Sequence, residues 1–322
     1  MDVLKIATLN ARGGGNKIEE IINTIQKCAN NVICLQEMHI VDDIGKRKIE
    51  NICNGVLYRN NGTSQSRGVA TFVKNQENMK QNGILKKDNV GRMLIVEIEW
   101  KSNSWVIFNL YAPNDSQQRE AFFQDVKKNS QHFRGIIVYA GDFNCVLDRF
   151  LDRTKSDSKG ATKSDKSRNS LRNMIGKENM VDSYRKIKPF WTAYTFTGPN
   201  GYRARLDRIY VSENMGNIID SVDVHAIPYS DHDLMTVTFG KEYTREKWGT
   251  GRWMLSTKLL WDEVTKQEIE ECVHYWRAHK MKFNSILEWW DNLKYKMKEV
   301  YAENGKRIQK NIQNERRTLE SD

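Results

Sequence analysis

The N-terminal part of the chain alternates between strand and helix patterns, and this alternation restricts the folds open to it. Val3 to Leu9 and Val32 to Leu35 are short apolar runs of the kind found in strands. Between them, after a glycine-rich break, Lys17 to Ala29 carries apolar residues at helical spacing. A strand, a helix and a strand in this order form a parallel pair with a right-handed crossover. The opening of the chain therefore predicts an α/β fold.

Polar residues follow both of these strands. Asn10 ends the first run and Glu37 comes shortly after the second. Because the carboxyl ends of parallel strands lie at the same edge of a sheet, we expect the two side chains to be close together. That edge is where α/β folds commonly place their functional sites.

The pattern recurs in the stretch Gly135 to Leu147, where the apolar run Ile136 to Tyr139 leads into Asp142 and Asn144. These two residues are two apart, so in an extended chain they point the same way. The carboxylate could activate water and the amide could bind a phosphate oxygen, so the pair suits phosphate chemistry. An ordinary turn is the alternative, because the sequence Gly-Asp-Phe-Asn also favours turns.

Further strand-like runs carry polar residues at their ends or within them. The run Trp105 to Leu110 leads into Tyr111 and Asn114, and Asp207 interrupts the alternating run Arg203 to Val211. A helix is predicted over residues 118–133, between the run Trp105 to Leu110 and the run Ile136 to Tyr139. The other predicted strands are Gly68 to Lys74, Met93 to Trp100, Ala193 to Phe196 (a hairpin partner of Arg203 to Val211), Val222 to Ile227, and Leu234 to Phe239, which Asp231 and His232 precede.

Charge and cysteine content indicate the class of partner and the compartment. The formal charge of +10 and the pI near 9.2 favour a polyanionic partner, although a generally basic soluble protein is the alternative. The five cysteines are odd in number and form no Cys-x-x-Cys pair, which indicates reduced thiols in an intracellular protein. No run approaches the ~20 apolar residues of a membrane span, and the N-terminus lacks the pattern of a secretory signal.

The composition changes after Gly240, which predicts a division into residues 1–240 and 241–322. Helical periodicity over Leu259 to Trp276 and Phe283 to Tyr301 makes the second part a helical, partly basic linker or extension. Within the first part, residues 152–172 are rich in Lys, Arg, Ser and Gly. They predict a mobile basic loop that holds DNA, with an ordinary solvated loop as the alternative.

In their order, the segments TLN, LQE, NLYAPN, GDFN, RLDRIYVS and SDHDLM resemble the motifs of the endonuclease/exonuclease/phosphatase superfamily, which has the DNase I-like fold. The resemblance covers about residues 3–240. It implies an α/β fold of four layers, a sandwich of two mixed β-sheets packed face to face and flanked by helices, with a C-terminal helical extension.

Two segments narrow the resemblance. LDRFLDR and RLDRIYVS most resemble the endonuclease domain of LINE-type (non-LTR) retrotransposon polyproteins, and GRWMLSTKLLWDE resembles the start of the linker toward the reverse transcriptase. The resemblance therefore implies a fragment, a truncated copy or a domesticated remnant of such a polyprotein.

The resemblance also implies a Mg²⁺-dependent endonuclease, with Mn²⁺ as the alternative metal, that nicks one DNA strand and leaves a 3′-hydroxyl. Glu37 would be the main metal ligand, helped by Asn10 and by Asp231, because Mg²⁺ prefers oxygen ligands.

The chemical roles are assigned in the same way. Asp142 would accept a proton from the attacking water, and His232, oriented by Asp207, would contact the phosphate. Three further residues would position the scissile phosphate and stabilise its developing charge: Tyr111, Asn114 and Asn144.

Three arginines are candidates for DNA binding. Arg12 stands where repair-type relatives carry an acid, which weakens a two-metal scheme and an abasic-site repair function. It could contact phosphate instead, or form a surface salt bridge. Arg203 and Arg205, near the tip of the predicted hairpin, could follow phosphates or enter a narrow minor groove.

DNA is thus the expected partner, with RNA as a further one inside a larger retrotransposon complex. No membrane partner is expected, and the expected location is nuclear. Two alternatives stay open: a catalytically inactive nucleic-acid-binding or assembly module, and the same fold acting as an RNA nuclease, abasic-site endonuclease or phosphatase.

Overall fold

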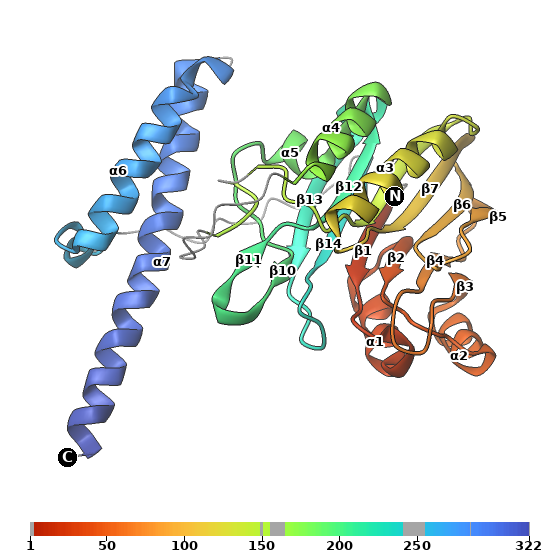
Figure 1. The fold of residues 1–322 in the computed structure, drawn as a ribbon, viewed down its shortest axis with the longest axis horizontal. Coiled ribbons are helices and arrows are strands. Elements are labelled where there is room, and N and C mark those ends of the chain that lie inside the picture. The colour runs from red at the N-terminus through yellow and green to blue at the C-terminus, as the bar shows by residue number, and fades with distance from the viewer. Residues whose placement is uncertain (1–2, 149–150, 155–164, 241–254, 284, 322) are drawn as a thin grey trace. The chain divides into compact units, whose positions relative to one another are not determined.

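The computed structural model describes residues 3–148, 151–154, 165–240, 255–283 and 285–321. The chain divides into two compact units, Met1–Tyr243 and Thr244–Asp322, and each is described by itself (Figure 1). All five cysteines lie in the described part and are free thiols. Among the described residues, the helices are too short or too polar to cross a membrane.

The first unit contains two six-stranded sheets, of which the first carries both chain-terminal strands of the unit. Strands β1 and β2 pair in parallel, as predicted, and the other neighbours in this sheet are antiparallel. In spatial order the strands are β13 (Ile219–His225), β14 (Leu234–Phe239), β1 (Leu4–Asn10), β2 (Val32–Gln36), β4 (Val69–Lys74) and β3 (Gly55–Asn60).

The second sheet is also mixed. Strands β7 and β8 pair in parallel, and antiparallel pairing joins the remaining neighbours. In spatial order the strands are β5 (Met79–Lys87), β6 (Met93–Trp100), β7 (Asn103–Tyr111), β8 (Ile136–Asp142), β12 (Asp207–Ser212) and β9 (Met180–Asp182).

Three apolar clusters show that the unit has four layers. One cluster joins the inner faces of both sheets. A second packs the first sheet against α1 (Ile18–Cys28) and α2 (Asp43–Cys53), and a third packs the second sheet against α3 (Ser116–Ser130) and α4 (Ser167–Lys177). Because both faces of each sheet are covered, interior strands such as β2, β4 and β8 read as nearly continuous apolar runs. The structure is the α/β sandwich of the DNase I-like fold (Figure 1).

The prediction of a basic loop over residues 152–172 is partly wrong. Helix α4 begins at Ser167, inside the stretch 152–172 that we expected to be a basic loop. Residues 151–154 are also ordered by contacts described below, and residues 155–164 lie outside the described residues. The prediction failed because α4 is short and strongly polar, so its helical face is hard to distinguish from a solvated loop.

Small elements complete the first unit. The predicted hairpin is present but shorter: β10 (Phe196–Thr197) and β11 (Arg203–Ala204) form a two-stranded sheet of their own, and the rest of the predicted run Arg203 to Val211 belongs to β12 of the second sheet. The connection of the hairpin is the short 3₁₀ turn Pro199–Gly201. Helix α5 (Ser183–Ile187) follows β9, and Asp182 caps it by accepting two backbone N–H groups.

The second unit contains two long helices, α6 (Glu263–Ala278) and α7 (Ile286–Ser321), preceded by a 3₁₀ turn at Thr257–Leu260. Both helices were predicted, with different ends. The indole of Trp289 donates a hydrogen bond of 2.9 Å to the backbone oxygen of the buried Trp276, which joins the two helices near their connection.

Candidate active site

Strand register brings the predicted residues to one edge of the sandwich. Asn10 lies opposite Gln36 in the parallel pair β1–β2, one residue before Glu37. In the second sheet Asp142 is the central partner, since it lies opposite both Tyr111 of β7 and Asp207 of β12. Gly141 makes this possible: a Cβ there would lie 1.9 Å from the backbone oxygen of Leu110.

Glu37 forms the first part of the site, together with Asn10 and Tyr111. The Tyr111 hydroxyl donates to Glu37 Oε1 at 2.7 Å, and Asn10 Nδ2 donates to the same oxygen at 3.1 Å. Glu37 has a φ of 51°, which is costly for a residue with a long side chain. The conformation is held because the Glu37 carbonyl accepts the N–H groups of Gly13 and Gly14.

Asp142 forms the second part and is buried. Its Oδ2 accepts from Asn10 Nδ2 at 3.1 Å, and its Oδ1 accepts from the Asn144 N–H at 2.8 Å. Burial raises the pKa of Asp142 to about 6, an effect that the nearby His232 partly offsets. A carboxylate with this pKa can take up a proton near neutral pH.

His232 and Asp207 form the third part. His232 Nδ1 lies 2.7 Å from Asp207 Oδ2, and its Nε2 lies 3.9 Å from Asp142 Oδ2. Burial by itself would lower the pKa of His232, but Asp207, through its charge and its hydrogen bond, and Asp142 raise it to about 10. The ring is therefore cationic at neutral pH, with its Nε2–H free to donate toward an anion beside Asp142.

The donor set fits a divalent cation. Among the described residues, Asp142, Asp207 and His232 offer polar atoms within 4.8 Å of one another; the two aspartates supply oxygen ligands, whereas both ring nitrogens of a cationic His232 carry protons and bind no metal. Asp207 Oδ1 is buried and has no hydrogen-bond partner among the described atoms. The half-exposed carboxylate of Glu37 adds a hard oxygen donor of the kind that Mg²⁺ prefers.

Asn10 and Asp231, the other predicted metal ligands, are engaged in hydrogen bonds and ion pairs. The amide oxygen of Asn10 accepts the backbone N–H of Arg12 at 3.0 Å, and its NH₂ group bridges Glu37 and Asp142. Asp231 Oδ2 lies 3.2 Å from the exposed guanidinium of Arg12. Arg12 was expected to contact phosphate or to form a surface salt bridge, and the structure contains the salt bridge. A metal role for either residue stays a prediction.

The residues predicted to position the phosphate differ in where they lie. Asn144, with a φ of 45°, donates its amide to the Ala112 carbonyl at 2.9 Å and lies beside Asp142. Asn114 lies outside this hydrogen-bonded group: it is exposed, and its backbone oxygen accepts from Arg119 at 2.7 Å.

The predicted DNA contact of Arg205 is wrong because its side chain is buried, whereas the DNA contact of Arg203 stays a prediction. Arg203 is exposed on β11. Arg205 is 1% exposed and pairs with the buried Asp152 and with Asp182. The two arginines differ because the chain leaves the hairpin after Ala204 and enters the protein interior.

Several residues that support the site were missed. The Ser230 hydroxyl donates to the Asn10 carbonyl at 2.7 Å and accepts the His232 N–H at 3.1 Å. Arg92 stacks on the Tyr111 ring, 4.9 Å from its centre, and donates to the Tyr111 carbonyl. Ser230 stands next to the predicted pair of Asp231 and His232, so the sequence signal was present.

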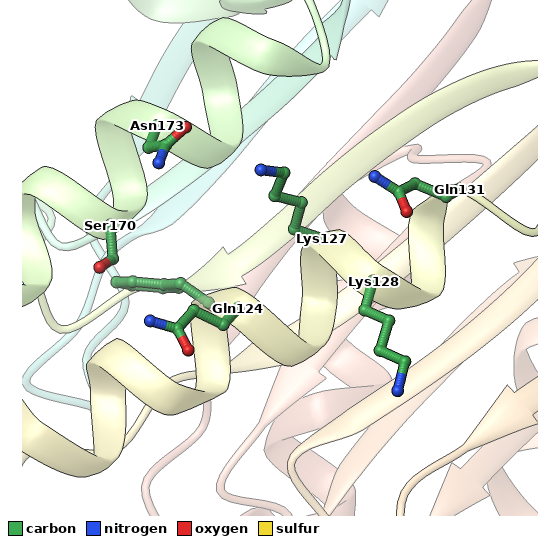
Figure 2. Close-up of a pocket in the computed structure, with 7 residues that line it drawn as sticks. Gln124, Lys127, Lys128, Gln131, Ser170 and Asn173 are labelled. Carbon is green, nitrogen blue, oxygen red and sulfur yellow. The ribbon is translucent and has the colours of Figure 1, made fainter.

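A hollow of about 280 Å³ lies elsewhere on the first unit, between α3 and α4. Its lining combines one aromatic ring with polar and basic side chains and contains none of the residues of the candidate active site (Figure 2). It therefore does not belong to the candidate active site. The lining residues are Phe123, Gln124, Lys127, Lys128, Gln131, Ser170 and Asn173.

The fold and the acid–amide–histidine site define a class of hydrolases that contains nucleases and phosphatases. Residues 7–232 match the model of the Endonuclease/Exonuclease/phosphatase family, and the chain belongs to that family. It is 26% identical over 315 residues to the transposon TX1 uncharacterized 149 kDa protein of Xenopus laevis, which confirms the retrotransposon-like resemblance. That match covers 95% of this chain but only 23% of the transposon protein.

Solved structures with the same fold are less similar in sequence. An AP endonuclease from Archaeoglobus fulgidus superimposes with a TM-score of 0.63 at 17% identity, over 73% of this chain and 99% of that one. The AP endonuclease LMAP from Leishmania major has a TM-score of 0.63 at 18% identity, over 75% and 89%. A variant of the 3′ phosphatase NExo from Neisseria, bound to a product DNA hairpin, has a TM-score of 0.60 at 20% identity, over 74% and 100%.

Proposed function

We propose that this chain is a divalent-metal-dependent endonuclease that nicks one strand of DNA by hydrolysis and leaves a 3′-hydroxyl. The observation that carries the proposal is the arrangement around Asp142: a buried carboxylate with a raised pKa lies between the amide of Asn10 and the cationic ring of His232. A base beside a fixed cation is what the attack of water on a phosphodiester requires.

Asp142 takes the proton of the attacking water, whose oxygen forms the new bond to phosphorus. The bond from phosphorus to the 3′ oxygen breaks and the leaving 3′ oxygen takes a proton from solvent water, so the products are a 5′-phosphate and a 3′-hydroxyl. His232, held by Asp207, donates to a phosphate oxygen and stabilises the charge that develops there. A divalent cation held by Glu37 would supply further neutralisation of that charge.

The net charge of +10 supports DNA as the substrate. So do the names of the similar proteins, which describe a transposon protein, an AP endonuclease and a 3′ phosphatase bound to a DNA hairpin. Exposed arginines near the site, Arg12 and Arg203, could contact phosphates on either side of the cut. A nick with a free 3′-hydroxyl could prime reverse transcription, as target-primed retrotransposition requires.

A nicking assay tests the proposal. Supercoiled plasmid is incubated with the protein and Mg²⁺, Mn²⁺ or a chelator, and the nicked circles are then offered to a DNA polymerase, which extends only from a 3′-hydroxyl. We expect open circles with either metal and extension of the ends. The variants Asp142→Asn and His232→Ala should lose nicking by at least about a hundredfold, whereas His225→Ala, at an exposed histidine on β13, should not.

Two results would contradict the proposal. Full nicking by the folded Asp142→Asn variant would remove Asp142 as the base. Plasmid bound but never nicked, with any metal, would favour the alternative of an inactive binding module.

A further inference from the structure

The β10–β11 hairpin is ordered along its outer edge by residues 152–154. Arg153 pairs with Ala204 in an antiparallel bridge, and the Thr154 N–H donates to the Arg203 carbonyl at 2.9 Å. The Thr154 hydroxyl accepts the Arg203 N–H in return, at 3.0 Å. The hairpin thus has a third strand-like segment beside β11.

Along its inner edge the hairpin is bonded to the loop that carries His232. The Thr197 N–H donates to the Asp231 carbonyl at 2.9 Å, and the Asp233 N–H donates to the Thr195 carbonyl at 2.7 Å. The Phe196 ring lies 5.0 Å from the imidazole of His232. Residues 152–154, β11, β10 and 231–233 therefore form one ribbon, which includes the active-site histidine.

A buried charged group fixes the outer end of this ribbon. The group, here called the arginine–aspartate cluster, has Arg205 at its centre. Arg205 donates through Nε to Asp152 at 2.8 Å, and both of its terminal nitrogens donate to Asp182, at 3.0 and 2.8 Å. Its other members, Arg185 and Arg208, also pair with Asp152.

The arginine–aspartate cluster attaches the ribbon to the second sheet. Asp182 ends β9 and Arg208 lies in β12, next to Asp207, while Asp152 belongs to the ribbon and Arg205 follows its strand β11 directly. The Arg205 N–H also donates to the Asp152 carbonyl at 2.8 Å. Forked, charge-assisted hydrogen bonds restrict geometry more strongly than single contacts do, so the ribbon is held in one orientation.

We propose that the arginine–aspartate cluster positions the β10–β11 hairpin relative to His232 and thereby selects which phosphodiester is cut. The proposal rests on the DNA-nicking function above. The exposed Arg203 and the tip at residues 198–201 would contact DNA at a fixed distance from His232, because the same ribbon carries both. The members of the cluster are positioning residues, since they lie in the interior.

The test uses the whole protein and three variants. Arg205→Lys keeps the charge but removes the forked contacts. Thr154→Val removes the hydroxyl that accepts the Arg203 N–H and donates to the Arg203 carbonyl, at the half-buried outer edge, where the risk to folding is low. The matched control is Arg59→Lys, at an arginine of the first sheet that pairs with Asp43.

Two readouts are taken: the positions of nicks on a DNA of known sequence, and the hydrogen-exchange rates of the Thr197 and Asp233 amides. In Arg205→Lys we expect exchange to accelerate by about tenfold or more, which corresponds to one lost charge-assisted hydrogen bond. The nicks should spread over more phosphates. Thr154→Val should change both readouts in the same direction, and Arg59→Lys should match the wild type.

Wild-type exchange rates and an unchanged nick map in folded Arg205→Lys would overturn the proposal. If Arg205→Lys does not fold, an unchanged Thr154→Val variant would overturn it equally. If the wild type does not nick DNA, the proposed function fails, but the exchange rates still decide whether the cluster positions the hairpin.

Discussion

At the scale of single residues, the site gives opposite tasks to two aspartates that lie opposite each other on neighbouring strands. Asp207 is bound to a histidine and keeps it charged, whereas Asp142 is bound mainly to amides and has a pKa of about 6. Both side chains are buried, and they differ in the partners to which they are hydrogen-bonded.

Replacing Asp207 by Asn should therefore reduce catalysis without moving His232 far. The substitution removes the charge that raises the pKa of His232, so less of the ring is cationic at neutral pH. We expect kcat for nicking to fall by about a hundredfold or more, with little change in KM. An Asp207→Asn variant with wild-type kcat would show that the charge of His232 is unimportant.

Asp152 predicts how stability depends on pH. Burial by itself would raise the pKa of Asp152, but Arg208, Arg205 and Arg185 hold it well below its usual range. The unfolded chain, with a pKa of ~3.9, binds the proton more readily, so this stabilisation is present above that pH and is lost as the pH falls through the lower folded value.

The measurement is urea unfolding between neutral pH and pH ~3, where the unfolded aspartate is mostly protonated. The wild type should lose stability steeply on the acid side, and Asp152→Asn should show a flatter acid limb. At neutral pH the variant should be less stable by roughly 3–5 kcal/mol, because it leaves buried guanidinium groups short of a partner. Parallel acid limbs in the two proteins would contradict the role of Asp152.

At the scale of elements, the sequence was most informative where strands are buried on both faces. Strands β6 and β14 were predicted with their observed ends because they are rich in apolar and β-branched residues, most of which are buried. Strand β5 and helix α2 were missed for a physical reason. β5 is an edge strand with mostly exposed side chains and an irregular register, so it lacks an apolar pattern, and α2 buries only a narrow face.

The site followed the same logic. The polar residues after buried strands could be singled out because polar side chains at the end of an apolar strand are a poor choice for packing a core. Arg205 was not, since its environment depends on Asp152 and Asp182, which are distant in sequence and become partners only after folding. Which sheets face each other came from the family resemblance, because strand patterns alone leave the pairing of sheets open.

The contact between the two sheets beneath the site contains a buried amide pair. Asn109 of β7 accepts from Gln36 of β2 at 2.8 Å and donates to the backbone oxygens of Leu35 and Ala70. It therefore links the strands that lead to Tyr111 and Glu37.

Replacing Asn109 by Ala should destabilise the first unit and loosen the site. Several buried groups would lose their partner, and each unsatisfied group costs about 1–3 kcal/mol. We expect a loss of several kcal/mol in urea unfolding and weaker binding of Mn²⁺. The control, Asn103→Ala at the exposed start of β7, should stay within about 0.5 kcal/mol. Equal stability of the two variants would contradict this role.

At the scale of the whole molecule, the two units differ in how much core they contain. The three apolar clusters lie entirely within the first unit. In the described part of the second unit, the two helices bury few apolar side chains, and Trp261, Met281 and Leu287 are largely exposed. A helix pair of this kind has little stability of its own.

A chain that ends at Gly240 should therefore fold and nick DNA. We expect its melting temperature to lie within about 4 °C of the full-length value, a shift that corresponds to less than about 1–2 kcal/mol. Differential scanning calorimetry and the plasmid assay check this. Aggregation of the shorter chain, or a much lower melting temperature, would show that the first unit depends on residues 241–322.

The register of strand β8 limits where the chain can tolerate insertions and deletions. Asp142 meets its partners only because β8 is in register with β7 on one side and β12 on the other. Removing one residue from β8 would turn its alternating side chains to the opposite faces and take the carboxylate away from the histidine. Changes of length at residues 198–201 leave that register intact, so variation in length within a lineage should accumulate at the hairpin tip and be absent from β8.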